Sequence, residues 1–331
     1  MNSGLNILVT GSNGFVGSNL MWLLESMGHY VIGIDKSARC NGRKHPNTLE
    51  QDILDIKRLK NITSPIDLII HAAAAKHDFG ITKEEYFLDN VEATKAIKDF
   101  ALAKSVKKIV YYSTVSAYGH PEKPCDESGL IIPNTEYGAT KLQGEYPLID
   151  WVNTESDRKL IILRPTVIYG PRNFANLYNF IDFRYRFPWL MLGKGTHIKS
   201  IVSLSNLLDM TIFGINNCKN SISIYNCIDK EYITLNELRK LIDKYLKIGS
   251  PKIFISSESL FIRFTGKIFD FLGDKLNIDF PINSDRINKF DTPTHYFSEK
   301  IRDDGYFQRN TIEDEIKKTV EWYLEYKEKI T

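Results

Sequence analysis

The stretch Thr10-Gly11-Ser12-Asn13-Gly14-Phe15-Val16-Gly17 decides the fold, because it joins an apolar run to a helical pattern. We predict a buried strand over Leu5–Thr10 and a helix over Phe15–Met27, which Gly28 is placed to cap. Glycines allow a tight turn and let the backbone approach a pyrophosphate, to which the start of a helix offers free N–H groups. The stretch therefore predicts a dinucleotide-binding loop.

The first half of the chain continues this alternation of short apolar runs and longer helical patterns. Such alternation predicts a parallel sheet with helices on both faces. The further predicted strands are Tyr30–Ile34, Ile66–His71, Lys108–Ser113 and Leu160–Arg164, and the further predicted helices are Thr82–Lys104 and Glu136–Asn153.

The pattern weakens after about Pro171, which predicts a change of architecture. We expect an α/β protein: a Rossmann-type doubly wound parallel sheet over residues 1–171, and a smaller mixed α/β C-terminal substrate lobe over residues 172–331. Some segments of that lobe are expected to return to the first domain. Its predicted elements are helices near Leu204–Ile215, Leu235–Lys247, Glu258–Leu272 and Thr311–Glu328, and a strand at Ser221–Tyr225.

Composition excludes several classes of protein. Lys and Arg number 43 and Asp and Glu 41, a balance that argues against a dedicated nucleic-acid binder. The four cysteines lack zinc-ligand spacing, so we expect no metal site. The first residues lack the regions of a signal peptide, and no apolar run approaches the roughly 20 residues of a membrane span. We therefore expect a cytoplasmic protein with no membrane partner.

Two carboxylates follow the glycine loop at places where a dinucleotide would meet them. Asp35 ends the second strand about twenty residues after the loop, where it can accept hydrogen bonds from ribose hydroxyls and would repel a 2′-phosphate. This favours NAD, although Lys36 and Arg39 leave NADP open. Asp52-Ile53 ends a further expected strand, where the carboxylate can meet the adenine amino group or simply shape a surface turn.

Tyr137 and Lys141 stand four residues apart on the helix predicted over Glu136–Asn153, so they share a face. A free tyrosine has a pKa of about 10, and a neighbouring ammonium lowers it by stabilising the phenolate. Such a pair can move a proton on a substrate hydroxyl while a hydride moves to or from a nicotinamide. Thr114 follows the strand Lys108–Ser113 and is expected to hold the substrate oxygen in the same crevice.

Together these residues resemble the extended short-chain dehydrogenase/reductase family, in its nucleotide-sugar epimerase and dehydratase branch. The matching positions run in family order through the first 175 residues or so. They are Gly11, Gly14 and Gly17; Asp35; Asp52-Ile53; His71-Ala72-Ala73-Ala74; Asn90-Val91; Ser113-Thr114; Tyr137 with Lys141; and Arg164-Pro165-Thr166-Val167-Ile168-Tyr169-Gly170-Pro171.

The resemblance implies a role for each group of residues. Tyr137 is implied as the acid/base, Lys141 as its support and Thr114 as the contact to the reacting oxygen. The cofactor-binding residues implied are Gly11, Asn13, Gly14, Phe15, Val16, Gly17, Asp35, Lys36, Asp52, Ile53, Ala72, Ala73, Ala74, Asn90, Ser113, Tyr137, Lys141 and Pro165. The substrate-binding residues implied are Lys76, Thr114, Val115, Ser116, Asn176, Lys199 and Arg286.

Two departures from the family pattern narrow the expected chemistry. The 4,6-dehydratases of this branch place an Asp-Glu pair directly after the threonine, where this chain has Val115 and Ser116. Neither residue titrates usefully, so we expect no dehydratase activity. Lys199 stands where many relatives have an arginine, and it lacks the bidentate fork of that side chain.

Three functions remain open on this basis. The leading expectation is a nucleotide-sugar 4-epimerase with bound NAD, and the alternative is an NAD(P)H-dependent reductase of a nucleotide-linked 4-keto-6-deoxysugar. A non-catalytic NAD(P)-sensing regulator is less favoured, because both Tyr137 and Lys141 are present. By analogy we expect a homodimer, formed through the helices Thr82–Lys104 and Glu136–Asn153, and a setting in polysaccharide biosynthesis.

Overall fold

The computed structural model describes two compact units, each built from several segments of the chain. The described residues are 4–40, 42–55, 59, 61–76, 80–121, 123–193, 195–255 and 294–330. Unit 1 comprises Met1–Ile168, Leu204–Ile228 and Tyr296–Arg309, and unit 2 comprises Tyr169–Ser203, Asp229–His295 and Asn310–Thr331.

Unit 1 is built on a seven-stranded sheet in the order β11-β6-β5-β4-β1-β2-β3, in which every neighbouring pair is parallel. The direction of strand succession reverses between β1 and β4, and such a switch point is where open α/β sheets bind their ligands. The sheet confirms the predicted Rossmann-type class. Its strands are β1 (Asn6–Thr10), β2 (Tyr30–Asp35), β3 (Thr48–Glu50), β4 (Leu68–His71), β5 (Lys108–Tyr112), β6 (Lys159–Pro165) and β11 (Ile222–Cys227).

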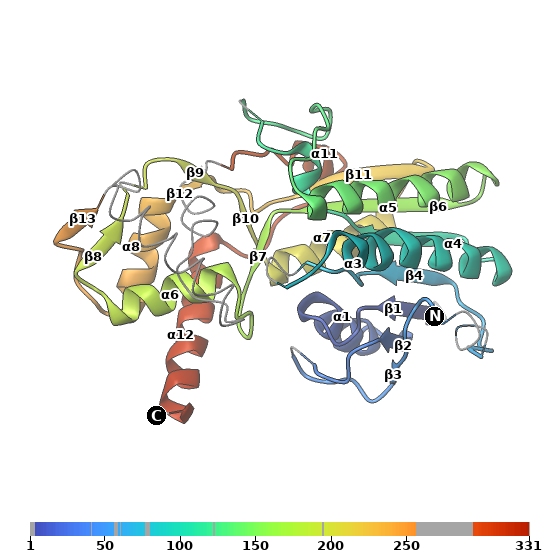
Figure 1. The fold of residues 1–331 in the computed structure, drawn as a ribbon, viewed down its shortest axis with the longest axis horizontal. Helices are drawn as coiled ribbons and strands as arrows, with labels where there is room; N and C mark the ends of the chain where they lie inside the picture. The colour runs from blue at the N-terminus through green and yellow to red at the C-terminus, as the bar shows by residue number, and fades with distance from the viewer. Residues whose placement is uncertain are drawn as a thin grey trace. The chain divides into compact units, whose positions relative to one another are not determined.

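Helices flank this sheet, because each strand carries apolar side chains on both of its faces. Helices α4 (Ala93–Ala103) and α5 (Glu136–Asn153) pack together, and Ile97 and Trp151 join strand residues in one buried cluster. Helices α1 (Phe15–Ser26) and α7 (Leu204–Asn217) also contact each other (Figure 1). The shorter pieces of unit 1 are the 3₁₀ turn η2 (Val115–Tyr118) and α11 (Glu299–Asp303).

The helix predicted over Thr82–Lys104 is helical from Lys83 to Ala103, but it is not one regular α-helix. The structure divides it into α3 (Lys83–Phe87), the π-helical turn η1 (Leu88–Glu92) and α4. The Thr94 hydroxyl donates to the Asn90 carbonyl at 2.7 Å, within the widened part of the helix. Widened turns of this kind often mark functional positions, and this one presents Asn90 to the loop after β4.

Unit 2 has its own apolar core, formed by helices and short strands. Helix α8 (Leu235–Leu246) begins with a capping box at Thr234 and packs against α12 (Ile312–Ile330) and α6 (Asn176–Arg186). Two strand pairs lie beside these helices: β8 (Leu190–Leu192) with β13 (Ile253–Ile255), and β9 (Ile198–Lys199) with β12 (Ile233–Thr234). The remaining strands are β7 (Val167–Tyr169) and β10 (Ile201–Ser203).

Several other sequence expectations can be compared with the described residues. The helix predicted over Glu136–Asn153 has those bounds in the structure, whereas the helix predicted over Glu258–Leu272 lies outside the described residues. Within the described part, no helix is long and apolar enough to cross a bilayer. The same residues contain no cluster of side chains able to hold a metal ion.

Candidate active site

The glycine loop after β1 is held in a conformation that only glycine allows. Gly11 has φ +69° and donates its N–H to the Ile34 carbonyl at 2.9 Å. A Cβ at Gly11 would lie 2.7 Å from the Ala73 nitrogen, and one at Gly17 would lie 2.1 Å from the Gly11 oxygen. The loop, the helix α1 and the segment after β4 therefore approach more closely than side chains would permit.

Unsatisfied polar groups converge on this loop. The Ser12 hydroxyl and the side-chain oxygen of Asn13 are buried and have no hydrogen-bond partner among the described residues. Helix α1 begins at Phe15 with Gly14 as its N-cap, without a side-chain cap and without an acidic residue in its first turn. Since Val16 and Gly17 also lie in this first turn, the loop presents free donors and a positive dipole end, as a dinucleotide pyrophosphate requires.

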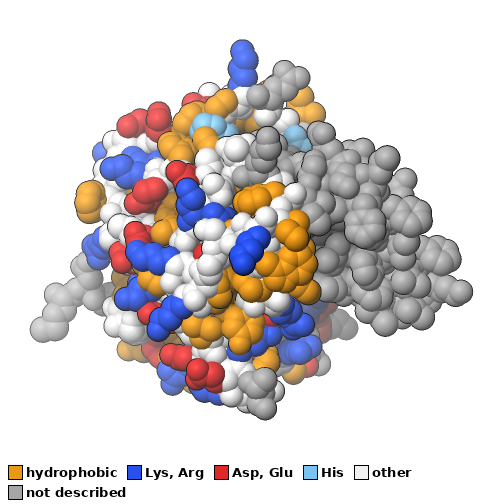
Figure 2. Space-filling view, turned by 90° about the vertical axis from the view of Figure 1, so that its left-hand side faces the viewer, with side chains coloured by type: hydrophobic (Ala, Val, Ile, Leu, Met, Phe, Trp, Pro, Cys, Tyr) orange, Lys and Arg blue, Asp and Glu red, His pale blue; other side chains and the backbone are white. Residues whose placement is uncertain are grey.

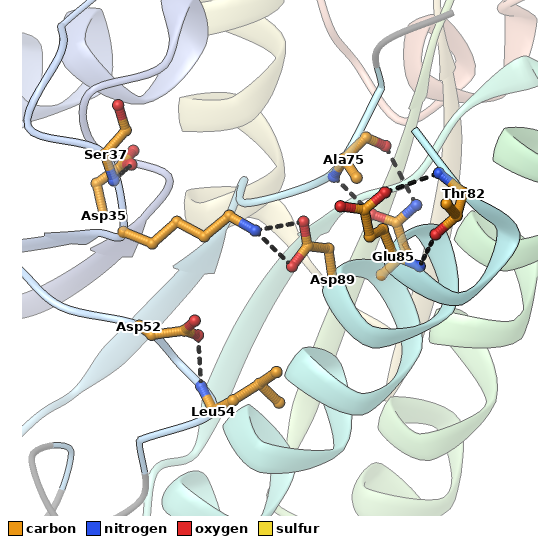
Figure 3. A network of polar contacts seen from close by, with 10 residues as sticks. Asp35, Ser37, Asp52, Leu54, Ala75, Thr82, Glu85 and Asp89 are labelled. Atoms are coloured by element: carbon orange, nitrogen blue, oxygen red, sulfur yellow. Dashed lines mark hydrogen bonds and ion pairs between the residues drawn. The ribbon is translucent and has the colours of Figure 1, made fainter. Parts of the chain in front are cut away.

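Asp35 lies at the end of β2 and touches the glycine loop directly. Its carboxylate accepts hydrogen bonds from the backbone N–H of Asn13 at 2.9 Å and of Ser37 at 2.8 Å. Lys36 turns away to the η1 turn, where its Nζ lies 2.5 Å and 2.7 Å from the two carboxylate oxygens of Asp89 (Figure 3). Lys36, which the sequence left open as a phosphate ligand, is therefore neutralised by Asp89.

Asp52 shapes a turn, which is the second of the two roles that the sequence left open for it. Its carboxylate accepts the Leu54 N–H at 2.9 Å (Figure 3). The intervening Ile53 is buried in the core cluster of unit 1. This contact explains the turn after β3 and leaves the role of Asp52 toward adenine a prediction.

The Ala72–Ala74 segment continues from β4 along the glycine loop. The Thr10 hydroxyl accepts the Ala73 N–H at 3.2 Å. Asn90 holds the next residue: its side chain accepts the Ala75 N–H at 2.9 Å and donates to the Ala75 carbonyl at 3.2 Å (Figure 3). It also donates to Thr140 on α5 at 3.0 Å. Asn90 therefore shapes the loop, although the sequence predicted it as a direct cofactor contact.

Tyr137 and Lys141 lie on consecutive turns of α5, and the Thr114 turn packs against them. The helix begins after Thr135, whose hydroxyl accepts the Gly138 N–H at 3.0 Å. A Cβ at Gly138 would lie 2.4 Å from the Ser116 carbonyl, so η2 lies directly against the residue that follows Tyr137. Thr114 caps η2 by accepting the Ser116 N–H at 3.1 Å. The structure thus brings all three predicted catalytic residues into one region of unit 1.

Lys141 is fully enclosed, and its environment changes its charge. Burial lowers the pKa of its ammonium to about 7, against the opposing effect of the Glu145 carboxylate. Its Nζ lies 4.2 Å from the centre of the Tyr111 ring. The nearby His71 is also buried, and desolvation together with Lys141 lowers the pKa of its imidazole to about 3. His71 is therefore neutral and bridges Thr10 at 2.6 Å and Thr94 at 3.0 Å.

A buried charged network lies beneath this helix, and the sequence analysis missed it. Glu145 accepts two hydrogen bonds from Arg164, at 2.9 Å and 2.6 Å, and one from Ser113 at 2.5 Å. Arg164 also donates to Tyr118 at 2.8 Å, and Tyr118 donates to Asn226 at 3.0 Å. Ser113, predicted as a cofactor contact, therefore uses its hydroxyl within the protein. Glu145 stands four residues after Lys141, a spacing that could have signalled it.

The positions that carry acids in the dehydratases are differently occupied here. Val115 is buried in a small cluster with Tyr118, Cys125, Ile228 and Tyr296. Ser116 is half-buried, and its backbone carbonyl accepts the Gly119 N–H at 3.1 Å. Neither side chain supplies an acid or a base to this part of unit 1.

The remaining predicted residues fall into three groups. Pro165 ends β6 and is buried in unit 1, and Lys76 is exposed beyond the loop after β4. Asn176 begins α6 and Lys199 ends β9, so both belong to unit 2. Arg286 lies outside the described residues. A role in substrate binding for Lys76, Asn176, Lys199 and Arg286 stays a prediction.

Curated proteins of known activity align with nearly the whole chain. Over 320 residues, the chain is 27% identical to an N-acetyl-alpha-D-glucosaminyl-diphospho-ditrans,octacis-undecaprenol 4-epimerase of Escherichia coli O157:H7, covering 96% of this chain and 95% of that protein. It is 25% identical to the human dTDP-D-glucose 4,6-dehydratase over 340 residues, covering 96% of this chain and 90% of that protein. Both alignments extend through unit 2, far beyond the matching motifs.

Among solved structures, the UDP-glucose 4-epimerase of Thermotoga maritima, crystallised with UDP-glucose, superposes with a TM-score of 0.77 at 21% identity. The superposition covers 97% of this chain and 99% of that one, which confirms the fold. The sequence model of the NAD dependent epimerase/dehydratase family matches residues 7–226, and these contain the glycine loop, Thr114, Tyr137 and Lys141. The chain therefore belongs to the NAD-dependent epimerase/dehydratase family.

Proposed function

We propose that the protein is a 4-epimerase of a sugar carried on a nucleoside diphosphate, acting by reversible hydride transfer with bound NAD. One observation carries this proposal: Tyr137 and Lys141 share a face of α5 against the Thr114 turn, in the unit whose glycine loop is shaped for a dinucleotide. The 4-epimerases among its relatives and fold neighbours support the same reaction.

Each catalytic residue has one task in this proposal. When bound, NAD supplies the site that accepts the hydride from C4 of the sugar and later returns it. The Tyr137 phenolate takes the proton from the C4 hydroxyl as the hydride leaves, and the hydroxyl so formed gives the proton back when the hydride returns to the opposite face. Thr114 orients the reacting oxygen. Lys141, when protonated, stabilises the Tyr137 phenolate, and Glu145 favours that protonated form.

We infer that NAD is preferred over NADP because of charge at the end of β2. Asp35 would repel a 2′-phosphate, and Lys36 is neutralised by Asp89. Arg39 is exposed and has no acidic partner among the described residues. Tight retention of the oxidised cofactor through purification would agree with an epimerase, which regenerates NAD in every cycle.

We also propose that the enzyme does not eliminate water, although a 4,6-dehydratase is among its relatives. The argument is chemical: elimination needs one group to remove a proton and another to donate one to the leaving hydroxyl. Val115 is buried among apolar side chains and Ser116 has an ordinary hydroxyl, so neither meets this need.

The relatives also raise the question of whether the sugar is carried on a nucleotide or on a lipid. The Escherichia coli relative acts on a sugar joined through a diphosphate to undecaprenol, and its alignment covers nearly the whole chain. We therefore propose a polyprenyl-diphosphate sugar as the competing substrate class. The diphosphate is common to both classes, so the described residues of unit 1 would serve either.

Exposed apolar side chains and free cysteines bear on the assembly and the location of the protein. We infer a homodimer through the helices of unit 1, because Phe87, Leu88, Leu102 and Tyr146 are exposed on α3, η1, α4 and α5. We infer a cytoplasmic setting, because all four cysteines are free, as is usual in a reducing compartment. Light scattering of the purified protein tests the dimer directly.

The decisive experiment incubates the purified protein with UDP-sugars, and in parallel with undecaprenyl-diphosphate sugars in detergent, without any added reductant. We expect conversion at C4 to an equilibrium mixture of epimers. Failure to form an epimer, together with steady consumption of NAD(P)H on a 4-keto-6-deoxysugar, would make the protein a reductase. Cofactor binding without any turnover would favour the sensing regulator.

A further inference from the structure

Unit 2 ends in a small apolar surface that its own core does not need. We call it the β8–β13 edge and define it by Phe187, Trp189, Lys252, Ile253 and Phe254. Its four apolar side chains are between 41% and 54% exposed, although side chains of this size are usually buried. Figure 2 faces the side of Figure 1 on which β8 and β13 are labelled, and it shows hydrophobic side chains gathered on that face, with Lys and Arg and some Asp and Glu side chains around them.

These residues are joined into one surface by backbone and ring contacts. Strands β8 and β13 pair in parallel, with Ile253 opposite Leu190 and Phe254 opposite Met191. The Trp189 carbonyl accepts the N–H groups of both Lys252 and Ile253 at 2.9 Å. The ring centres of Phe187 and Trp189 lie 6.4 Å apart.

A buried arginine holds the turn that presents the aromatic rings. Arg184 is fully enclosed and donates to the carbonyls of Phe187 at 3.2 Å, Pro188 at 2.8 Å and Leu190 at 2.5 Å. Its remaining donors meet Asp243 at 2.8 Å and 3.3 Å. Because the guanidinium donates to three backbone carbonyls, it fixes the turn over residues 187–190. Phe187 and Trp189 are therefore exposed on a rigid support.

The charge that is left uncompensated around this edge is positive. The segments 183–193 and 244–255 contain five cations and no Asp or Glu. Three of the cations are neutralised: Arg184 by Asp243, Arg186 by Asp182 and Lys244 by Glu313. Lys247 and Lys252 are exposed and have no ion-pair partner among the described residues. The surface is thus apolar at its centre and positive at its margin.

We propose that the β8–β13 edge docks on an anionic lipid bilayer. Trp and Phe side chains partition into the interfacial layer of a membrane, and lysines beside them are attracted to anionic headgroups. The inference departs from the expectation of no membrane partner, because that expectation concerned a spanning segment and this contact is peripheral. It goes beyond the proposed reaction and would bring the enzyme to any sugar diphosphate held on a lipid.

The test is co-sedimentation of the full-length protein with vesicles of phosphatidylcholine containing about 30% phosphatidylglycerol. We expect binding that weakens as salt is raised, and that falls about tenfold or more in the double variant Trp189→Ala, Phe254→Ala. Lys252→Glu should weaken binding to anionic vesicles and leave the small residual binding to pure phosphatidylcholine unchanged. Phe307→Ala is the matched control, because Phe307 is a highly exposed aromatic residue of unit 1.

Two results would overturn the proposal. One is vesicle binding that is absent, or equal in the wild type and the double variant. The other is loss of dimers in the double variant by light scattering, which would assign the edge to contact between two copies of the chain. Since the vesicle assay involves no turnover and the epimerase assay on UDP-sugars involves no membrane, failure of either proposal leaves the other intact. Unchanged thermal melting of each variant shows that it is folded.

Discussion

The two ends of the binding site in unit 1 are built on opposite principles. At the glycine loop, Gly11 and Gly17 have no side chain and leave space, and Ser12 and Asn13 each have a side-chain polar atom without a hydrogen-bond partner among the described residues. At the start of α5 it does the reverse and buries an amine, Lys141, above a network of satisfied charges. One end is prepared to be completed by a ligand, and the other is largely complete without one. Substitutions should therefore act mainly on binding at the first end, and on turnover and stability at the second.

Tyr137→Phe should have the largest effect, on turnover alone. Without the hydroxyl the proposed acid/base is lost, so we expect kcat to fall by about 10²- to 10⁴-fold while NAD stays bound. Turnover is measured by epimer formation, and cofactor content by absorbance after denaturation. Tyr146→Phe, at an exposed position of the same helix, is the control. Undiminished turnover in Tyr137→Phe would show that the acid/base is elsewhere.

Arg164→Met should have the next largest effect, on stability. It leaves the buried Glu145 carboxylate without its two strongest donors, and breaking a buried ion pair in this way costs about 3–5 kcal/mol. Chemical denaturation should show this loss in the free energy of unfolding. Arg186→Met removes the pair of the exposed Arg186 with Asp182, which keeps Lys327 as a partner, and should cost under about 1 kcal/mol. Similar losses in the two variants would show that the Glu145 network contributes no more than a surface pair.

Lys141→Met should abolish turnover and yet stabilise the ligand-free protein at neutral pH. The folded-state pKa of about 7 lies below the unfolded value of about 10.4, so the unfolded chain binds more protons between these limits. The contribution of Lys141 to the free energy of unfolding of the wild type therefore rises as pH increases from about 7 to 10. At pH 7 the variant avoids this cost, which amounts to up to about 4 kcal/mol.

Melting curves across this pH range test the prediction, with Lys95→Met on the surface of α4 as the control. The variant should lose the part of the pH dependence that belongs to Lys141. A variant that is less stable than the wild type at every pH would show that the buried amine contributes more by packing than it costs by desolvation.

Gly17→Ala should have the smallest effect on stability and act mainly on binding. The added methyl group would meet the Gly11 carbonyl, which is backbone and must shift, at a cost of about 1–3 kcal/mol. Because this shift opens the glycine loop, the loss in the free energy of NAD binding should exceed the loss in the free energy of unfolding. Calorimetric titration measures the affinity. Gly249→Ala, where no atom lies within 4 Å, should change neither quantity.

The same contrast explains what the sequence could and could not predict. The glycine loop, the strands beside it and the helix of Tyr137 depend on neighbouring residues, so periodicity and turn chemistry located them. The link from Ser113 to Glu145 spans 32 residues, and that from Tyr118 to Asn226 spans 108. No local pattern encodes such contacts, and for this reason the sequence analysis missed Glu145 and the bond that it receives from the Ser113 hydroxyl. The η1 turn was missed because the apolar pattern of residues 82–104 indicates a helix without showing whether one of its turns is π-helical.

The late position of β11 in the chain bears on how the protein is made. This strand completes the sheet beside β6, but it is translated only after the chain has passed through the first segment of unit 2. Asn226, which accepts the hydrogen bond from Tyr118 in the network of Arg164, arrives with it. A nascent chain that ends before this strand lacks the acceptor for Tyr118 in the buried network. It also leaves the edge of β6 unpaired. The catalytic region should therefore mature late in synthesis, and a fragment cut after residue 171 should need a chaperone to stay in solution.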